Sequence, residues 1–483
     1  MPLDGDVGLL LPEIIVTLAA VVALATGLRP QAGRAPAVWA FLGVTAAALL
    51  LLIGEGRGQA VEIWSGTVLV DGFARLFKLV FLVIAGLTVL VAADYVRRRG
   101  IPPGEFYLLL LLATVGMMFM AGSLNLLTIY LGLECLSLAS YSLSGLLRRD
   151  ARSTEAALKY ILIGAISSGT ILFGMSLVFG ATGSLHLGEV SQAVSSATGM
   201  TPVLLAGMMF LVVGLGVKMA AVPFHMWAPD VYDGAPAPVA AFLITGSEAA
   251  AFAAALRIFL VGLPSLRAEW TAVFVTLAVI TMTFGNISAI VQTRIRRLLA
   301  YSAVAQAGYV MVGLAIASDA AVSAMLYYLI AYAFTTIGAF TVVILLARHQ
   351  PADEIQDFRG LGQRAPLFAL ALTIFMLSFI GIPPTAGFFG KFYLFQAAVG
   401  AGMPWLAVIM VINGIISIPY YWGVVRTMYL SEAEDRSPLE APWGLRWATV
   451  IGLGATLVLG LFPDALVRVV NAIQVVPGLP IAF

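Results

Sequence analysis

The sequence has little charge and almost no cysteine, and each scarcity excludes a class of protein. Asp, Glu, Lys and Arg make up only 11% of the 483 residues, whereas 61% are hydrophobic. A water-soluble protein of this length needs more charge to cover its surface, so the expected solvent is a lipid bilayer. The single cysteine, Cys135, excludes an internal disulfide and any iron–sulfur site built on several cysteines of this chain. We therefore expect no electron-transfer cofactor in it.

The familiar motifs of nucleotide and metal sites are also missing. The sequence contains no Walker loop, no strand-based dinucleotide fingerprint and no histidine pair with metal-ligand spacing. The formal net charge is +1, without a basic or acidic tail, which does not suit a nucleic-acid partner. Asp4 and Asp6 stand where a signal peptide would carry basic residues, so the first apolar run is expected to be a retained helix.

Apolar runs of about 20 residues, the length that spans a bilayer, recur along the whole chain. The expected transmembrane helices lie near residues 8–27, 36–54, 72–93, 105–121, 123–145, 155–180, 202–222, 238–260, 270–292, 298–318, 320–347, 366–399, 404–430 and 446–468. The run 366–399 is long, but Pro383 and Pro384 in its middle indicate one broken helix. The sequence thus predicts an all-α integral membrane protein of about fourteen helices, without a separate soluble domain.

Arginine is distributed unevenly between the connecting loops. If the helices alternate in direction, sixteen arginines fall on one side and three on the other. The richer side carries Arg29, Arg34, Arg97, Arg98, Arg99, Arg148, Arg149, Arg152, Arg294, Arg296, Arg297, Arg348, Arg359, Arg364, Arg436 and Arg446. The poorer side, which includes both termini, carries Arg57, Arg267 and Arg468. Because cytoplasmic loops are rich in Lys and Arg, we expect both termini to lie outside.

All four lysines of the chain lie inside the apolar runs. They are Lys78, Lys159, Lys218 and Lys391. A lysine in the middle of a bilayer costs about 2.5–3.5 kcal/mol on insertion scales, so its retention indicates a function. Lysine can lose its proton when it is desolvated, which arginine cannot, and it can therefore carry protons. Lys78 lies close enough to its helix start to snorkel to the interface instead, and both interpretations stay open for it.

Glu134 lies in the middle of the fifth run. Tyr130, Ser137 and Tyr141 stand at helical spacing from it, so they form a polar stripe on one face of the helix. A carboxylate at this depth must pair with a cation or be protonated. Glu134 is therefore a candidate for proton transfer, and a purely structural ion pair is the alternative.

Two further glutamates lie inside apolar runs. Glu248 is near the middle of the eighth run, with Thr245 one turn before it, and the argument made for Glu134 applies to it. Glu13 in the first run lies nearer the outer surface, and we interpret it as structural.

The seventh run contains a helix break beside its lysine. Gly214 and Gly216 weaken the helix before Lys218, and Pro223 removes a backbone hydrogen bond after it. Backbone left unpaired at membrane depth is tolerated only where it lines a wet cavity or is buried in protein. His225 follows the break and titrates near neutrality unless perturbed. A lone histidine is usually structural, but its position beside a buried lysine favours a proton relay.

The twelfth run repeats this arrangement. Pro383 and Pro384 break it, and Lys391 follows two turns later. The segment ALKYILIGA (157–165) of the sixth run resembles AMLYYLIAY (324–332) of the eleventh, five helices later. Because five is odd, the two repeats would have opposite orientations, as in many transporters with broken helices. The expected units are 1–104 (helices 1–3), 105–260 and 261–430 (the two inverted repeats) and 431–483 (helix 14).

Four long segments resemble a known family. They are KYILIGA (159–165), VKMAAVPFHMWAPDVYDGAPAPVAAFL (217–243), QTRIRRLLAYSAVAQAGY (292–309) and SFIGIPPTAGFFGKFYLF (378–395). These segments look like the antiporter-like membrane subunits of respiratory complex I and of multisubunit sodium/proton antiporters, over roughly residues 105–430. Within the family, Lys391 and a chain that ends just after the fourteenth helix resemble the branch called subunit N of NADH–quinone oxidoreductase.

The resemblance implies a site residue by residue. The implied proton-relay residues are Glu134, Lys159, Lys218, His225 and Lys391. At one position the sequence departs from the family, because many relatives have a lysine where this chain has Glu248. A glutamate can also pass a proton, but it is neutral when protonated and charged when deprotonated, the reverse of lysine. The leading hypothesis is a proton path through Glu134, Lys218, Lys159, Glu248 and Lys391, in which Glu134 pairs with Lys218.

The resemblance also implies a setting. It implies a bacterial inner membrane, flanking subunits such as M, K and J, and a complex whose other subunits bind NADH, FMN, iron–sulfur clusters and a quinone. The first alternative is a subunit of a sodium/proton antiporter driven by ion gradients. The second is a structural membrane subunit whose buried pairs only hold its fold, although pairs kept only for stability seldom compensate for their desolvation.

Overall fold

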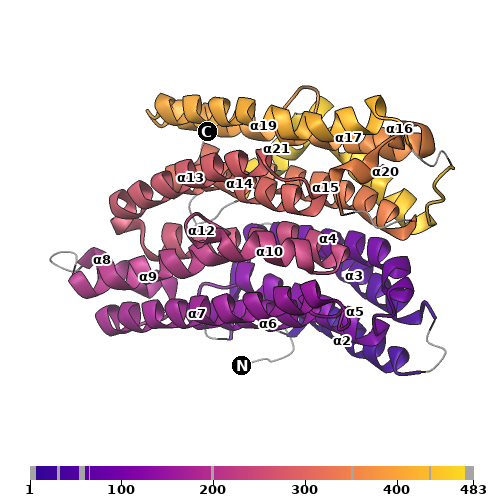
Figure 1. Ribbon diagram of the computed structural model, residues 1–483. Coiled ribbons are helices and arrows are strands. Elements are labelled where there is room, and N and C mark those ends of the chain that lie inside the picture. Colours follow the sequence, from indigo (N-terminus) through magenta and orange to yellow (C-terminus); the bar gives the residue numbers. More distant parts are fainter. Residues whose placement is uncertain are drawn as a thin grey trace.

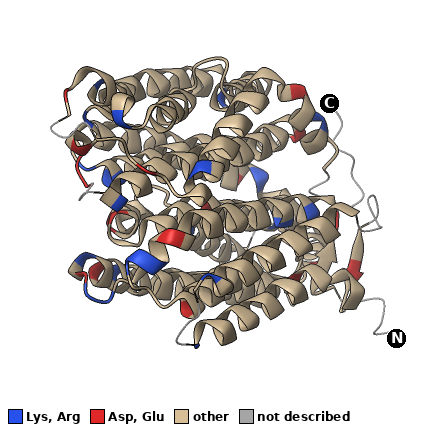
Figure 2. Ribbon diagram, turned by 90° about the vertical axis from the view of Figure 1, so that its right-hand side faces the viewer, with Lys and Arg blue, Asp and Glu red and all other residues tan. Residues whose placement is uncertain are grey.

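The computed structural model describes residues 7–29, 33–53, 60–64, 66–196, 201–349, 353–433 and 437–473. Helices that run side by side make up almost all of this part of the chain, with the N-terminal half packed against the C-terminal half (Figure 1). Figure 2 shows how few positions on the ribbon carry Lys, Arg, Asp or Glu.

Within the described residues, eleven helices are long and apolar enough to cross a membrane. They are α3 (Ala35–Ile53), α4 (Gly72–Arg98), α5 (Pro103–Ala121), α6 (Leu126–Ser144), α7 (Ala151–Thr182), the continuous helix Ala237–Gly262, the helix Pro264–Ile290, α14 (Ile295–Ile316), α15 (Asp319–His349), α19 (Pro404–Leu430) and α20 (Trp443–Leu461). Three shorter apolar helices are α2 (Leu11–Gly27), α9 (Pro202–Lys218) and α17 (Pro366–Ile380). Each of the fourteen coincides with one of the apolar runs of the sequence.

The remaining elements are short. They are η1 (Phe224–Met226) and α10 (Trp227–Gly234) after α9, α8 (Leu187–Ser196), η5 (Ile355–Phe358), α16 (Leu361–Arg364), α18 (Ala386–Gly400) and α21 (Pro463–Asn471). The helix Ala237–Gly262 consists of α11 (Ala237–Phe242), η2 (Leu243–Ser247), α12 (Glu248–Leu256) and η3 (Arg257–Gly262), and η4 (Pro264–Leu266) precedes α13 (Arg267–Ile290). Both η2 and η3 are π-helical turns. The turn η2 directly precedes Glu248, and η3 begins with Arg257.

A small hairpin corrects the purely helical prediction. Strands β1 (Val61–Ile63) and β2 (Val68–Val70) pair antiparallel in the connection between α3 and α4. The segment is rich in β-branched residues, which favour strands. The Leu69 amide donates to the carbonyl of Gly122, so the hairpin is also tied to the end of α5.

Several arginines that the sequence assigns to the richer side lie close together. Arg98, Arg152, Arg296 and Arg348 lie at the ends of four different helices, α4, α7, α14 and α15, and line one pocket. Arg57 and Arg436 lie outside the described residues, and so do both chain ends.

The two predicted helix breaks are present. Helix α9 ends at Lys218 and the chain resumes helical structure at Phe224, whereas α17 ends at Ile380 and α18 begins at Ala386. Gly381 between them has a φ of 93°, which a residue with a side chain rarely adopts.

Candidate functional site

Lys218 is 5% exposed at the end of α9 and points toward α6. Its Nζ donates to the hydroxyls of Ser137 (2.8 Å) and Tyr141 (3.3 Å). Both belong to the polar stripe that the sequence predicts around Glu134. On α6, Glu134 lies one turn before Ser137 and two turns before Tyr141. The stripe therefore faces Lys218, but hydroxyl groups rather than the Glu134 carboxylate contact its ammonium group. One carboxylate oxygen of Glu134 is buried without a hydrogen-bond partner in the described chain.

The break after Lys218 leaves few backbone groups unpaired. The Val222 amide donates to Thr281 Oγ1 (3.0 Å), and the Trp227 indole donates to the carbonyl of Val217 (2.8 Å). Side chains thus replace helix hydrogen bonds, as a non-helical segment in a membrane requires. His225 is buried there with its ring 4.6 Å from that of Phe284, and its Nδ1 has no partner among the described residues.

Gly214 and Gly216, which weaken a helix on their own, do not interrupt α9. Helix α9 continues through both residues to Lys218. A Cβ atom on Gly214 would lie 2.3 Å from Ile171 of α7, so this glycine permits close approach of two helices.

Glu248 is 3% exposed and lies at the start of α12. Its Oε1 accepts a hydrogen bond from the hydroxyl of Tyr232 (2.8 Å). A chain of aromatic rings leads back to the Lys218 cluster: Tyr141 packs edge-on against Tyr160, Tyr160 stacks on Trp227 at 4.7 Å, and Trp227 contacts Tyr232. Glu248 and Lys218 are therefore ends of one buried cluster in the first half of the bundle.

Lys391 lies beside the second break. Its Nζ donates to the carbonyls of Phe379 (2.7 Å) and Ile380 (3.2 Å), which are left free where α17 ends. The ammonium group also lies 4.1 Å from the centre of the Tyr309 ring, a cation–π distance. The break thus supplies acceptors to the lysine.

A second polar network adjoins Lys391 through the Phe379 carbonyl. Gln306 Nε2 donates to this carbonyl (3.2 Å) and to the hydroxyl of Tyr421 (3.1 Å). The Tyr328 hydroxyl donates to Gln306 Oε1, and the Tyr328 ring stacks on that of Tyr332. The segment QAGY of the sequence contains Gln306, but its glutamine was not among the predicted site residues.

Lys159 lies apart from these buried clusters. Its side chain is 40% exposed and forms ion pairs of 2.6 Å with Glu155 and with Asp230 of α10. Asp230 also pairs with Arg297 at 2.7 Å. The structure therefore places Lys159 in a partly exposed network that joins α7, α10 and α14.

Lys78 and Glu13 form a buried ion pair of 2.6 Å between α4 and α2. Their side chains are 2% and 4% exposed. Lys78 therefore does not snorkel to the interface, and Glu13 is its partner inside the bundle. The charges that looked peripheral in the sequence neutralise each other inside the bundle.

A second buried ion pair was missed by the sequence-based reasoning. Arg257 is fully buried and contacts both carboxylate oxygens of Asp71 at 2.6 and 2.7 Å, while its guanidinium lies 4.2 Å from the Phe73 ring centre. Asp71 also caps α4 by accepting from the Ala74 amide (2.8 Å). An arginine inside the apolar run 238–260 was the available signal.

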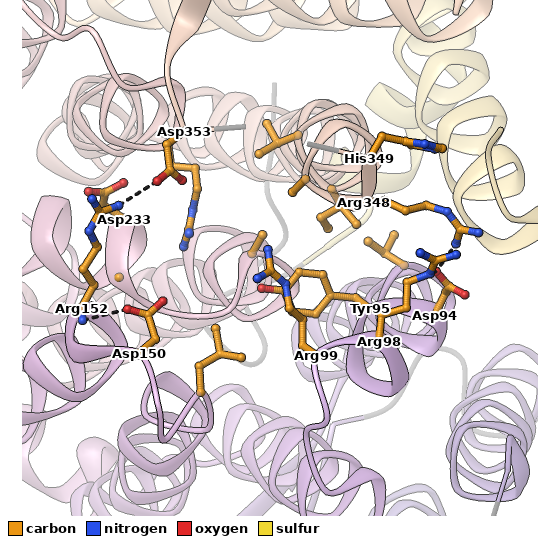
Figure 3. Close-up of a pocket in the computed structure, with 18 of the residues that line it drawn as sticks. Asp94, Tyr95, Arg98, Arg99, Asp150, Arg152, Asp233, Arg348, His349 and Asp353 are labelled. Carbon is orange, nitrogen blue, oxygen red and sulfur yellow. Dashed lines mark hydrogen bonds and ion pairs between the residues drawn. The ribbon is translucent and has the colours of Figure 1, made fainter. Parts of the chain in front are cut away.

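The arginine-rich face contains a pocket of about 540 Å³ (Figure 3). Asp233, directly after Tyr232 in α10, lines this pocket and pairs with Arg294 at 2.6 Å. The other Asp233 oxygen is buried without a hydrogen-bond partner in the described part of the chain. Arg152 and Asp353 pair at 2.7 Å on the same side. Within the described residues, no three His, Cys, Asp or Glu side chains are grouped so that they could hold a metal ion.

Comparison with known proteins shows which family this chain is similar to. The family described as "NADH:quinone oxidoreductase/Mrp antiporter, TM" matches residues 123–417. The NADH-quinone oxidoreductase subunit N 2 of Symbiobacterium thermophilum is 42% identical over 95% of each chain. The F(420)H(2) dehydrogenase subunit N of Methanosarcina mazei is 39% identical over 95% of this chain and 96% of its own.

Two solved structures share the fold. A chain of respiratory complex I from Thermus thermophilus is 34% identical, has a TM-score of 0.80, and aligns with 97% of this chain and 100% of its own length. A chain of the Mrp complex from Dietzia sp. has a TM-score of 0.83 over 97% of this chain and 96% of its own, at 21% identity, which supports the fold alone. This chain belongs to the NADH:quinone oxidoreductase/Mrp antiporter family of membrane subunits.

Proposed function

We propose that this chain is the antiporter-like subunit N of a quinone-reducing respiratory complex and that it carries protons across the membrane. The observation that supports this role best is the pair of buried ionisable side chains, Lys218 and Glu248, in one continuous cluster of hydroxyl and aromatic groups. An isolated charge at this depth is costly, and such residues mark ion paths in membrane proteins.

The first part of the path runs from Lys218 to Glu248. The Tyr141 hydroxyl contacts Lys218, and the Tyr232 hydroxyl contacts Glu248. A hydroxyl both donates and accepts, so it can pass a proton to water or to another side chain. Tyr160 lies between these two tyrosines. Water entering the cluster would complete the transfer.

Glu134 controls the charge of Lys218 in this mechanism. A negative charge one helical turn from Ser137, whose hydroxyl accepts from the ammonium, favours protonated Lys218. When Glu134 is neutralised, or another positive charge approaches, Lys218 releases its proton. His225 beside the break is a further relay group. Lys159, which pairs with Asp230 of α10, is the partly exposed member of the proposed path.

Lys391 acts in the second half of the bundle. Carbonyls of the broken helix hold its ammonium group, and Gln306 shares one of them. Because Tyr332 stacks on Tyr328 of this network, a row of polar aromatic side chains extends from Lys391 toward the first half. The proposed axis thus continues from Glu248 to Lys391.

The arginine-rich pocket supports access from one side of the membrane. Asp233 lines it and is the neighbour of Tyr232 in α10. By the asymmetry of arginine this side is the cytoplasm, and both termini lie on the periplasmic side of a bacterial inner membrane. All fourteen helices span the membrane in this arrangement, including the three shorter ones.

Two inverted five-helix repeats form the centre of the protein. The long helices α7 (32 residues) and α15 (31 residues) are each followed by a broken helix that carries a lysine of the axis. Glycines also bring the preceding helices together in each half: Gly116 faces Gly132 between α5 and α6, and Gly285 faces Ala305 between α13 and α14.

Other subunits supply the redox chemistry. NADH, FMN, iron–sulfur clusters and the quinone bind to them, and subunits M, K and J flank this chain. Relatives at similar identity carry names with different electron donors, NADH in one and F(420)H(2) in another. This diversity fits a subunit that transports protons and does not touch the donor. Copurification with flavin and iron–sulfur subunits would separate this function from sodium/proton antiport driven by ion gradients.

The test is the number of protons moved per electron by the assembled complex in proteoliposomes. Lys218→Met and Glu134→Gln are expected to lower this ratio in complexes that contain normal amounts of the subunit. Lys218→Arg is the matched variant, because it keeps the positive charge but cannot release a proton. A normal ratio in Lys218→Met, or full recovery in Lys218→Arg, would refute proton transfer through Lys218.

A further inference from the structure

A membrane-facing groove lies next to a basic pocket on the arginine-rich face. The groove, of about 140 Å³, runs along one face of α3 against α4 and the start of α20. Arg34, Val38 and Leu42 are one helical turn apart and line it, so a charged residue stands at the head of an apolar stripe. Phe41 and Trp443 contribute aromatic rings to the same groove.

The basic pocket has a volume of about 430 Å³ and lies between α2, α3, α4 and α5. Arg29, Arg34 and Arg97 line it, and Arg34 and Ala37 also line the groove, so the two spaces are adjacent.

Tyr107 contributes a buried, unpartnered hydroxyl group beside this pocket. Its side chain is 1% exposed and lines the pocket, yet its hydroxyl has no hydrogen-bond partner among the described residues. Buried hydroxyl groups are normally satisfied, because an unsatisfied one costs about 1–3 kcal/mol. A ligand with an acceptor oxygen would satisfy it.

The charges around the pocket leave a positive excess. Arg29 and Arg34 form no ion pair within 4.0 Å in the described chain, and the sequence from 14 to 54 contains neither Asp nor Glu. Arg97 lies 3.3 Å from Asp94, but Asp94 also pairs with Arg98 at 3.0 Å and with a further arginine from α15. One carboxylate is thus shared among three arginines.

We propose that the pocket and groove together bind an anionic phospholipid. Its phosphate lies between Arg29, Arg34 and Arg97 and accepts from Tyr107, and an acyl chain occupies the groove beside Leu42. Basic pockets between membrane helices on the cytoplasmic side suit such head groups. An apolar helix of another subunit could fill the groove, but it would leave the arginines and the tyrosine hydroxyl unmatched.

The experiment counts the phospholipids that the purified complex retains after detergent washing from nanodiscs of phosphatidylcholine and phosphatidylglycerol. Native mass spectrometry should show preferential retention of phosphatidylglycerol by the wild-type complex. The double variant Arg34→Gln/Arg97→Gln should lose a phosphatidylglycerol molecule, and Tyr107→Phe should lose it at lower detergent exposure. Arg149→Gln is the matched charge control, because Arg149 is exposed on the same face but lines neither space.

A second pair of variants tests the groove. Leu42→Trp fills it and should release the same lipid, whereas Leu49→Trp, two turns further along α3 and equally exposed, should retain it. Equal phosphatidylglycerol retention by the wild type and the double arginine variant would overturn the proposal, and so would equal retention of both lipids. Lipid binding is read out here without proton transport, so the result is independent of the proposed function.

Discussion

Removal of one partner from the buried Glu13–Lys78 pair tests whether these charges stabilise the fold. Lys78→Met deletes the ammonium group and leaves the Glu13 carboxylate without a cation in a region where both side chains are at most 4% exposed. Breaking a buried pair in this way costs about 3–5 kcal/mol, because an uncompensated charge stays buried. Replacing both members by apolar residues of similar volume is nearly neutral. The double variant Glu13→Met/Lys78→Met should therefore recover the stability that the single variant loses.

The assay is the temperature at which the subunit dissociates from the purified complex or aggregates. Lys78→Met should lower this temperature by several degrees, Glu13→Met should lower it similarly, and the double variant should return close to the wild type. The matched control is Lys159→Met, which should leave the dissociation temperature nearly unchanged. The Lys159 side chain is 40% exposed, and ion pairs of exposed side chains contribute only about 0–1 kcal/mol to stability.

Two results would refute this reasoning. If Lys78→Met has no effect on the dissociation temperature, the Glu13 carboxylate is not buried without compensation. If the double variant is as unstable as the sum of the single variants, the loss comes from packing and not from the unpaired charge.

The remaining predictions concern the proton path. Gly164→Ala on α7 would place a Cβ atom 1.9 Å from the Tyr141 hydroxyl and displace it, so the number of protons moved per electron should fall. Gly169→Ala on the same helix is the control, because a Cβ there would have no neighbouring atom within 4 Å, and this variant should pump normally. Equal behaviour of the two variants would contradict the role of Tyr141. Tyr232→Phe removes the hydroxyl bound to Glu248 and should slow proton uptake while the assembled complex stays intact; unchanged uptake would exclude Tyr232 from the path.

Much of the fold follows from hydropathy alone. Every expected span falls on helical structure, and eleven of these helices are long and apolar enough to cross a membrane. A run of about 20 apolar residues favours a helix, because in a bilayer every backbone polar group must be satisfied internally. The breaks after Lys218 and before Lys391 were also predictable, since proline cannot donate a backbone hydrogen bond. The β1–β2 hairpin was not, because three-residue strands lack a pattern strong enough to detect.

The candidate site was predicted only in part. The sequence singled out Lys218, Glu248 and Lys391 because a charge in an apolar run is conspicuous. It did not indicate Tyr232 or Gln306, because tyrosine and glutamine in a helix have many ordinary uses and only their contacts give them a role.

The sequence by itself determined the solvent, the helices, the breaks and which side chains are costly to bury. These properties depend on local composition and on the periodicity of one helix. Only the tertiary structure decided which charges meet: Lys78 with Glu13, Arg257 with Asp71, and Lys218 with the hydroxyls beside Glu134. Such partners come from helices far apart in the chain, and their pairing depends on how the helices pack. A single sequence contains no direct record of that packing.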